Sequence, residues 1–283
     1  MRFSQVLKDE RGKKEQKGDC HLTIQKPTRE LSIEETLTWT FDLYSNHVVT
    51  FFILLLVGSL ISGSLGAIIS NYARNVFQID TAFPSDISPS QLWGIILNLL
   101  AIALVSLLIT WLIDTVIHGI CIKYASGLIE QKKQSLDDAF NFTMHRLVSL
   151  LASAIIVAIL VVLGLIALVV PGIILIIMLS LTEPAILIED IGALDSLSRS
   201  RRLVSGRWLK TFAFLLIIGI IVVIVSYIGS LIATPFGDFS WVASSIISAF
   251  VAPIAPISTT VYYYSMIGKE EQQRIPPPPP PPF

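Results

Sequence analysis

The sequence predicts an all-α, polytopic membrane protein with six transmembrane helices, arranged as three pseudo-repeated hairpins that each follow an interfacial amphipathic helix. Of its 283 residues, 53% are hydrophobic and only 14% are charged, whereas a soluble domain carries about 25% charged residues. Several apolar runs are long enough to cross a hydrocarbon core of about 30 Å, which takes about 20 helical residues. A short segment recurs before each pair of runs: SIEETL at 32–37, SLDDAF at 135–140 and ALDSLS at 193–198. This repetition predicts three copies of one unit.

Residues 1–31 are predicted to form a disordered, charged cytoplasmic tail. The stretch KDERGKKEQKGD mixes both charges with glycine and has no apolar periodicity, so it buries too little surface to offset the entropy of ordering. Cys20 and His21 are neighbours, but two ligand types without a second pair do not make a metal site. We therefore expect Cys20 and Cys121 to be free thiols, and we predict no metal and no cofactor.

The first unit of the membrane domain, which we place at 32–268, begins at Ser32. Ser32 and Glu35 match a capping box, and apolar residues recur at helical spacing after them. Two spans follow, at about 47–72 and 92–122. Small residues recur every four positions in the first span, in two rows: Ser59, Gly63, Ala67 and Ser62, Gly66, Ser70. Such rows allow close helix packing in lipid, although small residues are also common in spans without any specific contact.

The second and third units each supply two more spans. No charged residue lies between Arg146 and Glu183, and a helix over this stretch would be about 54 Å long, too long for one crossing. Pro171 and Gly172 are therefore predicted to form a tight outer turn between spans at about 147–170 and 172–190. The third unit is predicted to span at about 208–233 and 241–267, and a proline-rich cytoplasmic tail follows at 269–283.

The basic residues predict the topology. Nineteen of the 20 Lys and Arg residues fall in the segments that would lie on one side of the membrane, and only Arg74 falls on the other. Loops rich in Lys and Arg stay in the cytoplasm. We therefore predict a multi-pass protein of the cytoplasmic membrane with both termini in the cytoplasm.

Ionisable residues and prolines within the spans suggest an intramembrane site. Asp114 and His118 lie one helical turn apart near the predicted inner end of the second span, where they either handle an ion or reach water at the interface. Glu183 and Pro184 interrupt the fourth span, and Pro253 and Pro256 interrupt the sixth. Broken helices at similar depth point to a binding site. The alternative is a pair of structural kinks, with Glu183 paired to Arg199, Arg201 or Arg202.

Two further segments suggest contacts outside the spans. Arg199, Arg201, Arg202 and Arg207 follow the fourth span and would suit anionic lipid headgroups, or would serve only to set the topology. The prolines Pro276 to Pro282 would form an extended polyproline II segment. That segment either docks a protein partner with an aromatic groove or acts as a solvated spacer.

The same region resembles a known family. The run PGIIL...LTEPAILIEDIGALDSLSRSRRLVSGRWLKTF resembles the six-span membrane domain of some glycerophosphoryl diester phosphodiesterases and of related prokaryotic membrane proteins. In that family a separate barrel carries the catalytic His and Glu residues, and this chain has no length to house one. The resemblance therefore implies a membrane domain and assigns no catalytic residue.

Two functions are compatible with these features. The first is a non-enzymatic membrane protein that organises lipids or partner proteins, including further copies of itself. The alternative is a transporter or pore for a small molecule, lipid or ion that uses the kinked fourth and sixth spans. An enzyme is not expected, because the chain has no Gly-rich phosphate loop, H-E-x-x-H motif or Ser/His/Asp arrangement. The net charge of -1 gives no reason to expect binding to nucleic acid.

Overall fold

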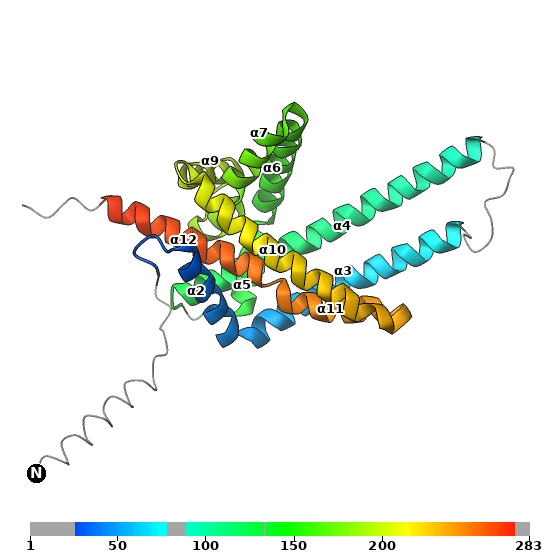
Figure 1. Cartoon of the computed structure of the whole chain (residues 1–283), viewed down its shortest axis with the longest axis horizontal. Helices are drawn as coiled ribbons and strands as arrows, with labels where there is room; N and C mark the ends of the chain where they lie inside the picture. The colour runs from blue at the N-terminus through cyan, green and yellow to red at the C-terminus, as the bar shows by residue number, and fades with distance from the viewer. Residues whose placement is uncertain (1–25, 78–88, 133, 275–283) are drawn as a thin grey trace, which may run out of the picture.

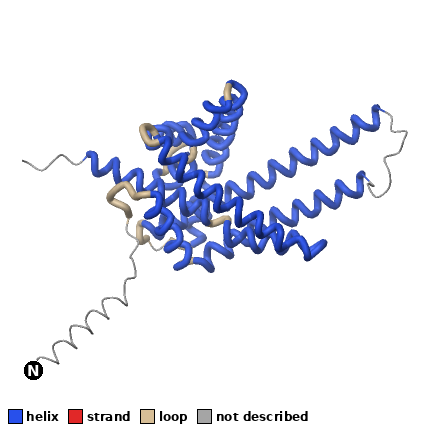
Figure 2. Tube along the Cα trace, in the orientation of Figure 1, coloured by secondary structure: helices blue, strands red, loops and turns tan. Residues whose placement is uncertain are grey.

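The computed structural model describes residues 26–77, 89–132 and 134–274, and every element within them is a helix (Figure 1 and Figure 2). The elements are α2 (Ile33–Asn46), α3 (Val48–Phe77), α4 (Pro89–Ile129), α5 (Leu136–His145), α6 (Leu147–Ala167), α7 (Val169–Leu179), α8 (Thr182–Glu189), α9 (Ala193–Val204), α10 (Trp208–Ala233), the 3-10 helix η1 (Thr234–Phe239), α11 (Ser240–Val251) and α12 (Ile254–Arg274). The tails at 1–25 and 275–283, with the proline run Pro276 to Pro282, lie outside the described residues.

Six helical stretches in the described ranges are long and apolar enough to cross a membrane. They are Val48–Tyr72, Ile96–Ile129, Leu147–Ala167, Val169–Glu189, Trp208–Gly237 and Ser240–Gln272. The predicted all-α fold is confirmed, with six helical stretches that are long and apolar enough to span a membrane.

A short helix leads each pair of long stretches. α2 precedes α3 and α4, α5 precedes α6 to α8, and α9 precedes α10 to α12. Ser32 caps α2 as predicted, because its hydroxyl accepts from the Glu35 N–H at 3.1 Å while Glu35 accepts from the Ser32 N–H at 2.8 Å. Ser135 and Asp138 repeat this capping box on α5. The order of elements is that of the predicted unit, used three times.

The turn between α6 and α7 lies at Leu168, three residues before the predicted Pro171–Gly172 turn. Leu168 is extended, with φ −165° and ψ 146°, and ends one helix as it starts the next. Pro171 falls in the first turn of α7, where the backbone N–H has no helical partner, so proline does not interrupt the helix. Gly172 instead allows close packing, since a Cβ there would lie 2.5 Å from Leu165 Cγ.

Both predicted kinks are present. The fourth stretch breaks between α7 and α8 at Ser180 and Leu181, just before Pro184, whose ring cannot donate to the Ser180 carbonyl. Ser200 of α9 satisfies this break, because its hydroxyl accepts from the Leu181 N–H at 3.1 Å and donates to the Met178 carbonyl at 2.8 Å. The sixth stretch breaks between α11 and α12, at Ala252 and Pro253.

The core lies toward the end of the molecule where the two described chain ends meet. Lys26 pairs with Glu271 there at 2.8 Å, and we call this end the terminal face. Tyr262, Tyr263 and Tyr264 of α12 are fully buried near it. The α3–α4 hairpin extends away from this core, and the α6–α7 hairpin projects in a different direction (Figure 1). Apolar side chains such as Leu104 of α4 are exposed far from the core, which is expected for a surface that faces lipid.

Three boundaries differ from the predicted ones. α4 continues seven residues past the predicted end of the second span, to Ile129, because Ile120–Ile129 packs into the core. Leu31, predicted to belong to a disordered tail, is only 3% exposed, and its N–H donates to Ser265 Oγ at 2.7 Å. α12 continues to Arg274, inside the predicted proline-rich tail.

Candidate functional site

A cavity of about 460 Å³ lies between α3, α4 and α11, and we call it the serine cavity. α4 contributes Asp114 and His118 to its lining. α3 contributes Ser59, Ser62 and Gly63, and α11 contributes Trp241, Ser244, Ser245 and Ser248. A carboxyl group, an imidazole and a row of hydroxyls thus line one cavity between three of the long apolar helices.

Some of the serine hydroxyls of this cavity form hydrogen bonds between helices, and one has no hydrogen-bond partner in the described part of the chain. Ser59 Oγ donates to the Ser245 carbonyl at 3.0 Å, and Ser245 Oγ donates to the Ser59 carbonyl at 3.1 Å, so this pair joins α3 to α11. Ser62 Oγ is buried, yet it has no hydrogen-bond partner within the described residues. A buried polar atom without a partner costs about 1–3 kcal/mol. A water molecule or a bound solute in the cavity would remove that cost.

Asp114 lies well before the end of its helix. The prediction placed it near the inner end of its span, but α4 runs on to Ile129, fifteen residues or about 22 Å further. The neighbouring Ile117 packs against Gly58, which lies ten residues, or about 15 Å, from the start of α3 at Val48. Asp114 therefore lies about four helical turns before the end of α4. Its side chain is exposed and lines the serine cavity.

Glu183 belongs to the same neighbourhood. It is half-buried on α8, beside α4, and interacts electrostatically with His118. The predicted pairing with an arginine is wrong for Arg199, which binds Glu189 and Glu270. The structure thus brings Glu183 near His118, which lines the serine cavity together with Asp114. The sequence predicted the Asp114–His118 pair but suggested Glu183 separately from it.

The three prolines of the predicted site lie near the serine cavity but do not line it. Pro184, Pro253 and Pro256 are buried and do not line the serine cavity, whereas Ala252, next to Pro253, does. The Pro256 carbonyl accepts from Thr260 Oγ1 at 2.7 Å. The prolines therefore shape the backbone beside the cavity, and threonine and serine hydroxyls satisfy carbonyls near the break.

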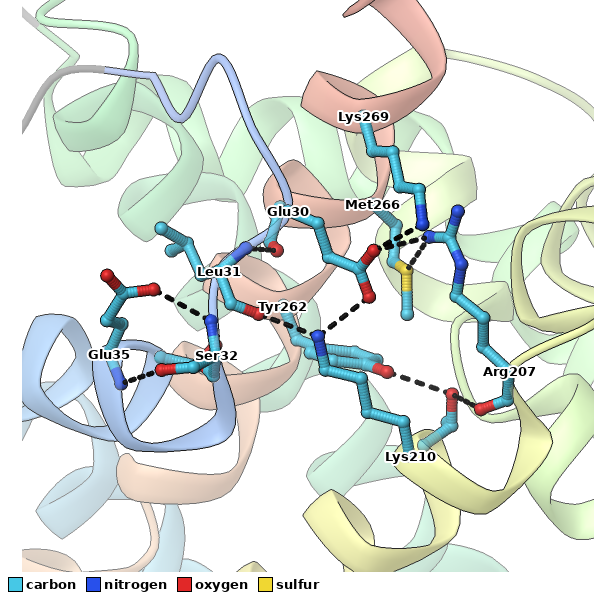
Figure 3. Close-up of polar contacts among 12 residues, drawn as sticks. Glu30, Leu31, Ser32, Glu35, Arg207, Lys210, Tyr262, Met266 and Lys269 are labelled. Atoms are coloured by element: carbon cyan, nitrogen blue, oxygen red, sulfur yellow. Dashed lines mark hydrogen bonds and ion pairs between the residues drawn. The ribbon is translucent and has the colours of Figure 1, made fainter. Parts of the chain in front are cut away.

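A second polar cluster lies on the terminal face, around Glu30 (Figure 3). Glu30 accepts from Lys210 at 2.7 Å and from Lys269 at 2.6 Å, and Arg207 lies 3.4 Å from the same carboxylate. Lys210 also donates to the Leu31 carbonyl at 2.8 Å. One carboxylate thus joins the segment before α2 to α10 and α12.

The three cations dominate the electrostatics of Glu30. Burial alone would raise the pKa of this carboxyl, but the hydrogen bonds from Lys210 and Lys269 and the attraction of Lys210 and Arg207 outweigh it. The pKa of Glu30 is therefore held below its ordinary value near 4.5. Glu30 stays ionised at neutral pH.

The four arginines proposed to bind headgroups fall into two classes. Arg199 is 8% exposed and pairs with Glu189 at 2.7 Å and Glu270 at 2.6 Å. Burial would lower the pKa of its guanidinium, but the two glutamates raise it above its ordinary value. Arg207 approaches Glu30, and only Arg201 and Arg202 of the four are exposed. Arg199 and Arg207 therefore stabilise the fold, and Arg201 and Arg202 remain on the surface.

Sequence reasoning missed the serine cavity and the role of Glu30. The two rows of small residues in α3 were a signal for the cavity, because both face α11, but they predicted close packing rather than a hollow. Glu30 offered no local signal, since its partners Lys210 and Lys269 are 180 and 239 residues away. Within the described residues, no group of three or more His, Cys, Asp or Glu side chains could hold a metal ion.

Comparison with known proteins gives one match. Residues 139–264 match a family described as a domain of unknown function (DUF7847). No match was found among curated proteins or among solved structures. The resemblance to the membrane domain of glycerophosphoryl diester phosphodiesterases stays a prediction, because no match concerns that family. The matched region begins in α5 and ends in α12, so the chain is similar to this family over its second and third units. Of the three helices around the serine cavity, α11 lies inside the matched region, whereas α3 and α4 lie before it.

Proposed function

We propose that the protein binds a small polar solute in the serine cavity and moves it across the membrane. The observation that carries this proposal is the placement of Asp114, His118 and five serines around one cavity of about 460 Å³ between membrane-spanning helices. Ionisable residues within a membrane are costly and usually mark a solute or ion pathway. Its unpartnered Ser62 hydroxyl supports the presence of a bound species.

The broken helices support movement as well as binding. Breaks at Ser180–Leu181 and at Ala252–Pro253 interrupt the fourth and sixth stretches, and α11 ends beside the cavity with Ser248 and Ala252 in its lining. Discontinuous helices around a central site are a recurring feature of transporters.

An osmotic assay tests this function. Vesicles with and without the purified protein are mixed with a series of small polar solutes and salts, and light scattering follows their reswelling. We expect at least one solute to enter faster in vesicles that contain the protein, and Asp114→Asn to slow that entry. Asp137→Asn, on the exposed first turn of α5, is the matched control. No faster entry for any solute would contradict the proposal.

Binding of anionic lipid at the terminal face is a second candidate function. Arg201 and Arg202 are exposed on α9, and Leu194 and Trp208 are exposed nearby in sequence, at 72% and 46%. Exposed cations beside apolar side chains suit a headgroup surface, and each cation near that surface contributes about 1 kcal/mol. A non-enzymatic role in organising lipids at the cytoplasmic membrane, with cytoplasmic termini, would follow.

Lipid retention separates this role from transport. After purification from membranes of mixed lipid, mass spectrometry counts the anionic lipids that stay bound. We expect Arg201→Gln combined with Arg202→Gln to reduce that number without changing solute entry. An unchanged number of bound anionic lipids would remove the support for this role.

A further inference from the structure

A second hollow lies next to the serine cavity. It has a volume of about 850 Å³, and we call it the vestibule. Gly66, Ser70 and Asn71 of α3 and Ser240 of α11 line it, together with Gly63 and Trp241. Gly63 and Trp241 also line the serine cavity, so the two hollows meet at these two residues.

The two hollows follow α3 in order. Vestibule residues run to Asn71, in the part of α3 that extends away from the terminal face, and cavity residues run back to Leu55 (Figure 1). Beyond Leu55 the interior is packed. Phe51 is fully buried, and its ring meets Tyr124 of α4 edge to face at 5.4 Å between centroids. The vestibule therefore lies toward the end opposite the terminal face, and the serine cavity lies between the vestibule and this aromatic pair.

We propose that the vestibule and the serine cavity form one path that admits small monovalent cations from the end opposite the terminal face, with Asp114 and Ser62 as the cation site. This inference rests on the proposed function and names the class of solute. Among the described residues, Asp114 is the one acidic side chain that lines either hollow, and it lies in the inner one. The vestibule lining has hydroxyls, an amide and an indole and no charged side chain in the described part of the chain.

The chemistry of the lining favours a cation over an anion. Carboxylate and hydroxyl oxygens are ligands for hard cations, and a hollow with one sign of charge at its inner end raises the local concentration of the opposite ion. Among the residues that the structure describes, no lysine or arginine lines the serine cavity, and His118 is the one basic side chain in its lining. His118 shares α4 with Asp114, and Glu183 interacts with it from α8.

Gly63 and Trp241 make the junction narrow. A Cβ at Gly63 would lie 2.5 Å from Ser245 Oγ and 3.4 Å from the Trp241 ring, so no side chain fits between α3 and α11 at that level. The neighbouring Ser62 hydroxyl is the buried polar atom without a partner. A cation that passes the junction would reach this oxygen and Asp114 in the same cavity.

Thiol labelling tests the path and its charge preference. Ser62→Cys and Asn71→Cys are made separately in a Cys20→Ser background, and Cys121 is retained because it is fully buried. The purified protein is treated with a trimethylammonium methanethiosulfonate or with the sulfonate reagent of similar size, and intact-mass spectrometry gives the two rates. The ratio of cationic to anionic rate at Asn71→Cys corrects for the different intrinsic reactivities of the reagents.

We expect the corrected ratio at Ser62→Cys to exceed about tenfold and to fall close to one when Asp114→Asn is added. Trp241→Ala should widen the junction and speed labelling of Ser62→Cys by both reagents, without a change at Asn71→Cys. Phe212→Ala, at an exposed aromatic residue of α10 that lines neither hollow, is the matched control, and each variant must keep the parent melting temperature.

The outcomes separate the inference from the function it rests on. A folded Ser62→Cys protein that reacts with neither reagent, with and without Trp241→Ala, would overturn the path. A corrected ratio of one, in a protein that still speeds solute entry into vesicles, would overturn the cation class and leave transport intact. The expected ratio without solute entry would support the cation site and contradict transport.

Discussion

Glu30 is a single carboxylate that joins three distant parts of the chain, and its loss should be measurable. Its side chain is 18% exposed, and those of Lys210 and Lys269 are each 30% exposed, so water partly screens the cluster. We expect Glu30→Gln to lower the free energy of unfolding by about 2 kcal/mol, because three cations lose their counter-charge. Thermal melting in detergent measures this. Glu34→Gln on the exposed side of α2 is the control, and equal melting temperatures for the two variants would contradict the prediction.

The contribution of Glu30 should depend on pH. Its pKa in the folded protein lies below the ordinary value near 4.5, so folding favours the ionised form. That stabilisation is fully present above the ordinary pKa and is lost as the pH falls through the lowered folded pKa. The difference in melting temperature between the parent protein and Glu30→Gln should be constant from pH 7 to about pH 5 and shrink below about pH 4.5. A difference that grows on acidification would contradict this assignment.

In contrast to Glu30, Glu183 should matter for solute entry and not for the stability of the fold. Because Arg199 pairs with Glu189 and Glu270, replacing Glu183 breaks no ion pair of the terminal face. Glu183→Gln should therefore change the melting temperature little, while it alters solute entry through the interaction with His118. Melting and vesicle reswelling on the same preparation check both parts. A large loss of stability with unchanged entry would assign Glu183 a structural role.

At the scale of elements, the α6–α7 hairpin depends on two glycines. A Cβ at Gly172 would lie 2.5 Å from Leu165 Cγ and 2.8 Å from the Leu165 N, and a Cβ at Gly164 would lie 3.0 Å from the Gly172 Cα. We expect Gly172→Ala to destabilise the protein by about 1–3 kcal/mol through overpacking. Gly219→Ala on α10, where a Cβ would meet nothing within 4 Å, should be neutral or stabilising. A shift of the same sign in both variants would contradict the close packing.

The helices could be predicted from the sequence more accurately than the turns and ends that bound them. Run length and composition predict the six spanning stretches, and Ser32 and Ser135 mark helix starts because capping is local chemistry. The turn at Leu168 escaped prediction because proline is tolerated at a helix start as well as in a turn, so Pro171 fits either. The end of α4 at Ile129 could not be predicted from the apolar run, because a helix that packs into the protein core need not end where the lipid ends. The Glu30 cluster and the serine cavity both arise from tertiary packing, which no local pattern encodes.

At the scale of the whole molecule, the side of the membrane on which the terminal face lies is a prediction of the basic residues. Reporter fusions within 78–88, after Leu168 and after Pro235 should report the outside. Fusions at both chain ends, after Lys132 and after Ser205 should report the cytoplasm. The fusions after Lys132 and Ser205 serve as an internal control for the first set, because Lys132 follows the end of α4 and Ser205 precedes the start of α10. A cytoplasmic signal from any of the first three positions would contradict the topology.

The ion pair between Lys26 and Glu271, at 2.8 Å, brings together the two ends of the part of the chain that the structure describes. This closeness makes the chain a candidate for circular permutation, which is tolerated where chain ends are adjacent and a surface loop is opened. Residues 275–283 followed by 1–25 would serve as the new connection, and a cut between Ser205 and Gly206, both exposed, would create the new ends. Such a permutant would begin with α10, would be synthesised with α10 to α12 first and α9 last, and would still place each helix beside the same neighbours. Its helices would enter the membrane in a different order, while the final packing would stay the same. Comparing the permutant with the parent protein would therefore show whether the order of insertion affects the yield or the stability of the folded protein.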